Sequence, residues 1–276
     1  MPSSPNAAVR FEEVTKVFFA GPFRSGVRAL DGVSLSIESG EVFGLIGPNR
    51  AGKTTLVKVL LSICRPTSGR IMRLGRHYKD RSTLARVGYV HESQAFPRYL
   101  TAQALLEFYG AISLAPKAIV RRRAGELLER FGLADRSREP IARFSKGMLQ
   151  RLAVCQSLIN DPELLVLDEP SEGMDLSARR VLDEIIADRK QLGRTSILVS
   201  HHLNDVERLC DRVALIRGGK VAFDGRVSEL LGQENGPADA ARFGDWPTEG
   251  LPADRSLPTN RSLENVLEPL YAGTQQ

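Results

Sequence analysis

The sequence predicts an α/β fold in which a parallel sheet carries a helical insertion and is preceded by a small antiparallel β portion. Three observations lead to this prediction. Apolar and polar residues alternate before residue 40, residues from about 100 to 160 show helical periodicity without strand patterns, and strands and helices alternate after residue 163. With 276 residues, 42% of them hydrophobic, the chain can bury one substantial core or two small ones.

The antiparallel portion is expected first along the chain. Residues 9–19 form one candidate strand, and a second carries Val33, Leu35 and Ile37 in alternation with polar residues. A turn at residues 66–69 leads into a short strand over residues 70–74.

A buried strand over residues 41–46 leads into the stretch LIGPNRAGKTTL, which contains the pattern G-x-x-x-x-G-K-[ST]. In this pattern the backbone N–H groups of a tight loop converge on phosphate, the lysine reaches the β- and γ-phosphates, and the hydroxyl binds Mg²⁺. Leu56, Leu60 and Ile63 recur at helical spacing behind it, so the loop opens a helix, where anions are favoured. The predicted nucleotide site consists of Gly47, Pro48, Asn49, Arg50, Ala51, Gly52, Lys53, Thr54 and Thr55.

Arg50 stands where many such loops carry glycine, which adopts a positive φ at no steric cost. The pattern allows any residue there. A guanidinium that reaches phosphate and one that points into solvent both remain open.

Helices are predicted between the two halves of the sheet. Thr101 is a natural N-cap for a helix carrying Leu105, Phe108 and Ile112, and a second helix carries Leu127, Leu128 and Phe131. Ser145 is the expected N-cap of a third helix, and its N-terminus is a second anion site in this chain. Alone this is an ordinary capped helix, but beside a nucleotide loop it suggests a contact with another subunit's nucleotide.

The apolar run LLVL at residues 164–167 ends in the two carboxylates Asp168 and Glu169. Ligands of open α/β sheets bind at the carboxyl ends of the strands, so this strand is expected to present its acids to the nucleotide. Asp168 is expected to hold Mg²⁺ through water, and Glu169 to orient or deprotonate an attacking water.

Together these motifs resemble the ATP-binding subunit of ABC transporters over nearly the whole chain. GPNRAGKTT is similar to the family's Walker A, FSKGMLQRL to its signature, LLVLDEP to its Walker B, EGMD to its D-loop and SHHL to its switch-histidine loop. The resemblance implies a P-loop NTPase (RecA-like) core with an N-terminal antiparallel β subdomain and an inserted α-helical subdomain. This ATPase domain would span residues 1–231 with its helical subdomain at about 93–160, and residues 232–276 would form a linker and a short C-terminal helical tail.

The resemblance also implies roles for individual residues, with ATP and Mg²⁺ as cofactors. Catalysis would rest on Glu169, Lys53 and His201, which contacts the γ-phosphate, whereas His202 would point elsewhere because neighbours in a helix do not share a face. The Mg²⁺ ligands would be Thr54, Glu92 and Asp168. In a head-to-tail dimer, the partner's ATP would meet the signature residues, and Asp175 would belong to the D-loop. The signature residues are Ser145, Lys146, Gly147 and Met148.

Some positions depart from the family pattern or leave a choice. The Q-loop reads YVHESQ, with His91 in place of proline, and Glu92 is favoured over Gln94 as its Mg²⁺-sensing residue. Lys146 and Met148 replace the commoner Gly and Gln of the signature. Phe18 matches the adenine-stacking aromatic, while Phe19 and a simple core role remain alternatives.

The signature SKGM, the His-His pair and the ending SLENVLEPLYAG resemble single-domain ATPases of bacterial ABC-2-type exporters. This implies a homodimer or heterodimer of ATPase subunits at the cytoplasmic face of the inner (plasma) membrane, attached to separately encoded integral membrane permease subunits. A coupling helix from these subunits would contact a surface that includes four aromatic residues, Phe96, Tyr99, Phe108 and Tyr109. The alternative is that these aromatics are only part of the core.

Composition supports this location without identifying cargo. No secretory signal or membrane-spanning stretch is seen, and the three cysteines lack metal spacing, as expected for reduced thiols. The net charge of +5 is scattered apart from residues 121–123, and aromatics make up only 6%, so no nucleic-acid partner is expected. The competing hypotheses are a soluble ABC ATPase acting on nucleic acid or ribosomes, and a regulatory nucleotide switch with little turnover.

Overall fold

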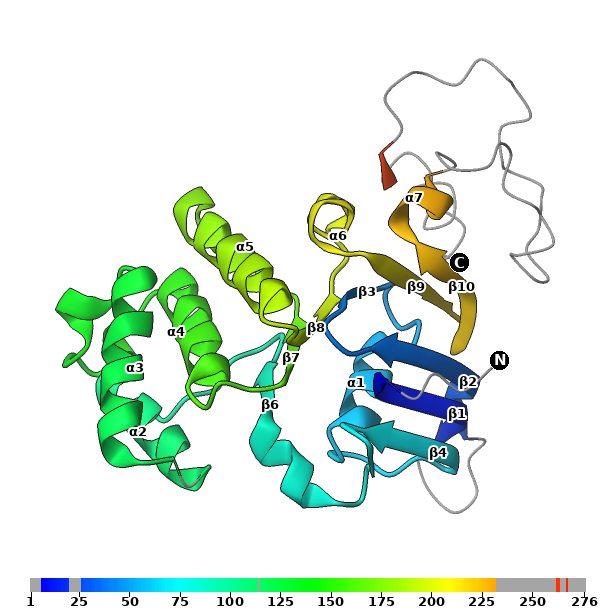
Figure 1. The fold of residues 1–276 in the computed structure, drawn as a ribbon, viewed down its shortest axis with the longest axis horizontal. Helices are drawn as coiled ribbons and strands as arrows, with labels where there is room; N and C mark the ends of the chain where they lie inside the picture. The colour runs from blue at the N-terminus through cyan, green and yellow to red at the C-terminus, as the bar shows by residue number, and fades with distance from the viewer. Residues whose placement is uncertain (1–5, 20–25, 114, 232–261, 264–266, 268–276) are drawn as a thin grey trace. The chain divides into compact units, whose positions relative to one another are not determined.

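The computed structural model describes residues 6–19, 26–113, 115–231, 262, 263 and 267. The chain divides into two compact units, which Figure 1 shows as a ribbon. The first unit contains the residues up to 79 and from 199 onward, and the second contains residues 80–198. The predicted linker and most of the predicted tail lie outside the described residues.

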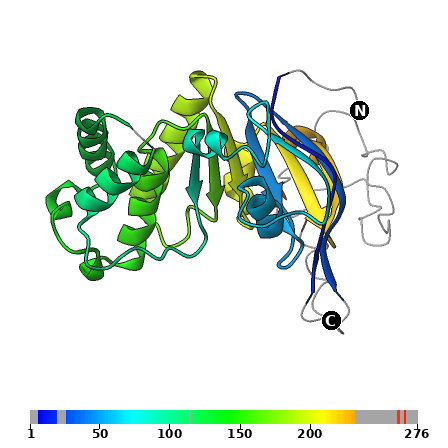
Figure 2. The same cartoon turned by 90° about the horizontal axis from the view of Figure 1, so that it is seen from below.

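The first unit contains a four-stranded antiparallel sheet in the order β2-β1-β4-β5, and Figure 2 shows its long blue strands as one curved layer. Phe11 of one long strand pairs with Leu35 of the other, and the alternating Val33, Leu35 and Ile37 are all buried. The predicted antiparallel portion is therefore confirmed. Its strands are β1 (Ala7–Phe18), β2 (Val27–Glu38), β4 (Ser68–Arg73) and β5 (Arg76–His77).

The first unit also carries the strand that precedes the nucleotide loop. This strand, β3, is buried along its whole length, runs parallel to β9, and β9 pairs antiparallel with β10. The elements are β3 (Val42–Ile46), α1 (Lys53–Leu60), α6 (Leu203–Leu209), β9 (Arg212–Arg217), β10 (Lys220–Arg226) and α7 (Val227–Leu230).

The second unit contains three strands, which lie side by side in the order β8-β7-β6. Strands β6 and β7 run parallel. Between these two strands the described residues form helices, as predicted. The strands are β6 (Val87–Val90), β7 (Leu164–Asp168) and β8 (Thr195–Val199). The α-helices are α2 (Ala102–Ile112), α3 (Lys117–Arg130), α4 (Lys146–Leu158) and α5 (Leu176–Gln191), and the 3₁₀ turns cover Arg81–Arg86, Ala134–Arg136 and Ile141–Arg143.

Helices α2, α3 and α4 pack against one another (Figure 1). Each of them has buried side chains, such as Leu105, Leu128 and Leu152. Their starts confirm two predicted caps. The Thr101 hydroxyl accepts a hydrogen bond from the backbone N–H of Ala104, and the Ser145 hydroxyl accepts one from Met148.

The structure corrects some of the predicted packing. Ile63 is exposed and lies beyond α1, because the helix ends at Leu60 and Ser62 then adopts a left-handed φ of 60°. Phe108 and Ile112 are also exposed, since the buried face of α2 runs through Leu105 and its neighbours instead. None of the helices in the described residues is long and apolar enough to cross a membrane.

Candidate functional site

The nucleotide loop follows β3 and opens α1, as the sequence predicted. Lys53 is the first residue of α1 and is only 9% exposed. Its Nζ donates to the carbonyl oxygens of Gly47 at 2.5 Å and Pro48 at 3.1 Å, so the ammonium group is held across the loop. A cation in this position, at the N-terminus of a helix, suits a bound polyphosphate.

Positive φ angles shape this loop at Arg50 and Gly52. Gly52 has a φ of 114° and packs against Ala29, where a Cβ would lie 2.5 Å from the carbonyl oxygen. Arg50 has a φ of 65°, although it is not glycine, and it is exposed to solvent. A left-handed conformation costs a residue with a Cβ roughly 1–2 kcal/mol, so the loop holds Arg50 against its own preference.

Strands β6 and β7 bring predicted acidic residues to one edge of the second unit. Val90, the last residue of β6, pairs with Leu167 in parallel register, so Glu92 lies just beyond the carboxyl end of β6 and Asp168 is the last residue of the neighbouring β7. Burial raises the pKa of Tyr89, and the negative charges of Asp168 and Glu92 raise it further. Both carboxylates therefore act on the same hydroxyl, and oxygen ligands of this kind are those that Mg²⁺ prefers.

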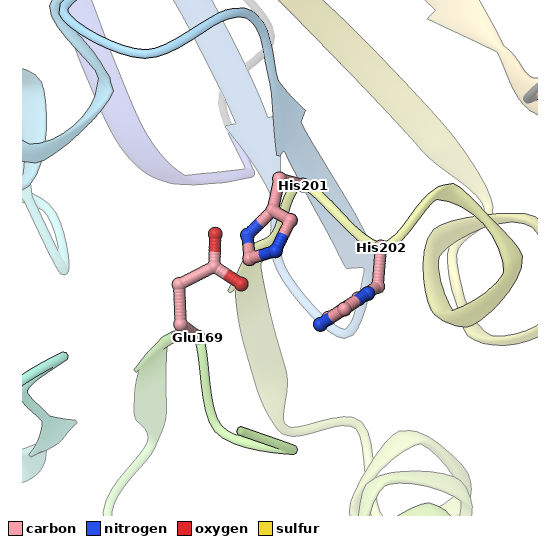
Figure 3. A group of neighbouring side chains, drawn as sticks. All are labelled: Glu169, His201 and His202. Atoms are coloured by element: carbon pink, nitrogen blue, oxygen red, sulfur yellow. The ribbon is translucent and has the colours of Figure 1, made fainter. Parts of the chain in front are cut away.

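Glu169 is the first residue after β7 (Figure 3). It is buried and has a φ of 50°. This conformation is unexpected from the sequence, because a residue before proline normally adopts an extended backbone. Gln150 in α4 supplies a restraint that sequence analysis missed. Its buried side chain donates from Nε2 to the carbonyl oxygens of Glu169 at 3.3 Å and Pro170 at 3.1 Å.

The predicted signature residues form the start of α4 and contact the turn between β7 and α5. A Cβ on Gly147 would lie 2.6 Å from the carbonyl oxygen of Gly173, so the two main chains are in direct contact. Beside them, Lys146 Nζ lies 2.6 Å from Glu172 Oε1. The Met148 side chain is buried, and the Met148 N–H donates to the Ser145 hydroxyl, so this helix end presents Ser145 and the Lys146 ammonium group as polar groups.

Asp175, the predicted D-loop residue, is the N-cap of α5. Its carboxylate accepts from the backbone N–H of Ala178 and the hydroxyl of Ser177. These hydrogen bonds lower the pKa of Asp175 below its usual value.

His201 and His202 follow β8 and precede α6 (Figure 3). Their ring centroids are 4.1 Å apart, with 37° between the ring planes. The prediction that His202 points elsewhere is therefore wrong. It assumed helical geometry, whereas His202 is the N-cap of α6 and has an extended backbone.

The predicted Q-loop segment is organised by His91. The backbone N–H of Ser93 donates to His91 Nδ1 at 2.9 Å, and the Gln94 amide donates to the His91 carbonyl. Histidine thus closes, through its side chain, a turn that proline would have set through its ring. Glu92 is exposed beside this turn.

Exposure decides between core and surface positions for the predicted aromatics. Phe18 is 43% exposed at the end of β1, with Lys16 Nζ 4.7 Å from its ring centroid, and Phe19 is 70% exposed. Neither is a core residue. Tyr99 and Phe108 are likewise exposed, whereas Phe96 and Tyr109 are half-buried.

The predicted residues are therefore shared between the two units. The first unit holds the nucleotide loop, Phe18 and His201, and the second holds Glu92, Asp168, Glu169, the signature residues and Asp175. Chemically, the first unit offers a phosphate-binding loop, and the second offers acids suited to a divalent cation and to an attacking water.

Comparisons with known proteins agree with these features. Residues 30–172 match the domain family described as ABC transporter. An uncharacterized ABC transporter ATP-binding protein of Nostoc sp. is 42% identical over 87% of this chain and 72% of its own length. The Nod factor export ATP-binding protein I of Ralstonia nicotianae is 36% identical over 83% of this chain and 70% of its own length. A solved ATP-binding subunit of an ABC transporter superposes with a TM-score of 0.75 at 27% identity, covering 84% of this chain and 97% of the other.

Proposed function

This chain belongs to the ABC transporter family as an ATP-binding subunit, and we propose that it is the ATPase of an ABC-2-type exporter that drives separately encoded membrane subunits. The observation that carries the proposal is the pair of buried carboxylates, Asp168 and Glu169, at the end of β7 in a chain whose other unit carries a phosphate-binding loop. Similarity to a relative named for export supports the direction of transport.

ATP hydrolysis would proceed by positioning and charge stabilisation. Lys53 would bind the β- and γ-phosphates, Glu169 would take the proton of the attacking water, and His201 would contact the γ-phosphate. Asp168, Glu92 and Thr54 each carry an oxygen of the kind that Mg²⁺ prefers and would hold the ion, which would neutralise charge on the phosphates when bound. Phe18 would stack on the adenine, since its ring is exposed at the end of β1.

Two ATPase subunits would form a head-to-tail dimer, as a homodimer or a heterodimer. Each ATP would be bound by the nucleotide loop of one subunit and by the start of α4 in the other, where Ser145 and Gly147 lie. ATP would close the dimer, and hydrolysis would reopen it. The access of the membrane subunits would change with each cycle.

The membrane subunits would contact the exposed aromatic side chains of the second unit. Tyr99 and Phe108 are 82% and 54% exposed, which supports this role over a core role. The protein would then sit at the cytoplasmic face of the inner (plasma) membrane, held there by its partners.

Affinity purification of the Glu169→Gln chain from detergent-solubilised membranes, with ATP present, tests this function. We expect a polytopic membrane protein to copurify in near-equal amount. The matched Lys53→Ala chain should bind ATP poorly, so less of the membrane protein should copurify with it in an ATP-dependent way. Recovery only from the soluble fraction, together with nucleic acid or ribosomes, would contradict the transporter function and favour the competing soluble ATPase.

Measured turnover separates the exporter from a regulatory switch. A transporter ATPase should hydrolyse ATP over many cycles, and its rate should respond to the membrane partner. Binding of ATP without multiple turnovers in the purified complex would favour the switch.

A further inference from the structure

Gln150 lies one turn into α4 and is almost fully buried, with 5% of its surface exposed. A buried amide is costly unless it is hydrogen-bonded, and this one donates to two successive carbonyl oxygens, those of Glu169 and Pro170. Since both acceptors are carbonyls, the amide must present its NH₂ group to them.

These two hydrogen bonds act on a backbone that the local sequence does not favour. Glu169 has a φ of 50°, which residues with a Cβ rarely adopt, and it precedes proline, which favours an extended backbone instead. Within its own turn, the Glu169 carbonyl also accepts from the backbone N–H of Glu172 at 3.4 Å. Contacts from outside the turn are therefore needed to hold the conformation, and Gln150 provides two of them.

The conformation of Glu169 matters because it determines where its side chain points. A change of φ at this residue would redirect the Cα–Cβ bond and move the carboxylate away from its site. General-base catalysis requires the carboxylate to lie within hydrogen-bond distance of the attacking water, so a small displacement is sufficient to lower the rate.

We infer that Gln150 is a positioning residue that fixes the main chain of Glu169 and thereby links the signature end of α4 to the carboxylate that activates water. This inference rests on the proposed role of Glu169 in ATP hydrolysis. It adds that the helix which meets the partner's nucleotide also orients this subunit's own carboxylate.

Two further contacts connect the same helix to the same turn. Gly147 is in contact with the carbonyl of Gly173, and Lys146 forms its ion pair with Glu172. A displacement of the start of α4 would therefore be transmitted to the turn after Glu169 through three separate contacts. Of these three, the contact from Gln150 reaches Glu169 itself.

Gln150→Met tests the inference, because methionine has a similar length and no N–H group. We expect kcat to fall roughly 10- to 100-fold while KM for ATP stays within about twofold, since the nucleotide loop is untouched. Gln150→His restores one donor at a similar reach and should recover a measurable part of kcat. Gln156→Met, the same substitution in the half-buried part of α4, is the matched control and should leave kcat unchanged.

Accumulation of the ATP-bound dimer distinguishes positioning from a loss of structure. Uncleaved ATP keeps the dimer closed, so Gln150→Met should accumulate more ATP-bound dimer than the wild type, with a Tm close to that of Gln156→Met. A protein that had merely lost structure would instead lose the dimer and melt earlier, which would overturn the inference.

Glu169→Gln, measured in the same assay, separates this inference from the function on which it rests. If Glu169→Gln is inactive while Gln150→Met has the wild-type kcat, the positioning role is wrong and the proposed function stands. If Glu169→Gln hydrolyses ATP like the wild type, the role assigned to Glu169 fails, and the inference fails with it.

Discussion

Gly147 and Gly173 are in contact through their main chains: a Cβ on Gly147 would lie 2.6 Å from the carbonyl oxygen of Gly173. Side chains essentially never approach so closely, and backbone atoms cannot yield as a flexible side chain can. Glycine at 147 therefore allows the start of α4 to lie directly on the turn that precedes α5. The same glycine belongs to the segment expected to meet the partner's nucleotide.

Gly147→Ala should separate dimer formation from nucleotide binding. The added methyl group forces the start of α4 away from Gly173, so we expect ATP-dependent dimerisation to be lost. ATP binding by the monomer should persist, because the nucleotide loop is unchanged. Light scattering after gel filtration measures the first property, and titration with a fluorescent nucleotide measures the second.

Gly125→Ala is the matched control, since a Cβ on Gly125 in α3 would meet nothing within 4 Å. This variant should dimerise normally, and its free energy of unfolding should exceed that of the wild type by about 0.5–1 kcal/mol, because alanine has a higher helix propensity than glycine. Normal dimerisation of Gly147→Ala would show that the contact with Gly173 is not needed for the dimer.

Two N-caps with the same geometry separate stability from function. Ser145 and Thr101 each accept a hydrogen bond from the third residue of their helix. Alanine at either position should cost about 1 kcal/mol of unfolding free energy, measured in urea. Only Ser145→Ala should also weaken the ATP-dependent dimer, and equal effects of both variants on the dimer would refute a phosphate contact by Ser145.

Arg50→Gly should stabilise the protein. Relief of the left-handed conformation gains about 1–2 kcal/mol, and the greater freedom of glycine in the unfolded chain costs about 0.5–1 kcal/mol, so a net gain of about 0.5–1 kcal/mol is expected. Arg81→Gly replaces an exposed arginine in a 3₁₀ turn without positive φ and should instead destabilise. Equal losses in the two variants would mean that the Arg50 side chain stabilises its loop by more than the strain costs.

The cap of α5 predicts a pH dependence of stability. The pKa of Asp175 is lowered in the folded protein, so its contribution is present above the unfolded pKa of about 3.9 and is lost as the pH falls through the folded value. Asp175→Asn keeps a cap oxygen but does not titrate. The wild type should exceed this variant in unfolding free energy at pH 7, and the difference should vanish at strongly acidic pH. A difference independent of pH would exclude the charge of Asp175 as its cause.

The sequence predicted those features that local chemistry determines. Thr101 and Ser145 were recognisable as caps, and the apolar run before Asp168 as a buried strand, because each depends on neighbouring residues alone.

The left-handed backbone of Glu169 was not predictable, since proline at 170 favours an extended conformation and the restraint comes from Gln150, nineteen positions earlier in the chain. The paired rings of His201 and His202 were missed because α6 begins one residue later than assumed. The effect of Asp168 and Glu92 on the pKa of Tyr89 depends on strand register, which the sequence does not display.

Turnover and dimerisation of Glu169→Gln, measured together in the purified protein, show whether the Glu169 carboxylate activates the attacking water. The amide keeps the shape of the side chain but cannot accept the proton of the attacking water. We predict that ATP hydrolysis falls at least about 100-fold and that an ATP-bound dimer accumulates. Lys53→Ala is the control: it should bind ATP poorly and therefore show neither dimer nor turnover. Hydrolysis at the wild-type rate by Glu169→Gln would contradict the account, because the carboxylate at the end of β7 would then not be the group that activates water.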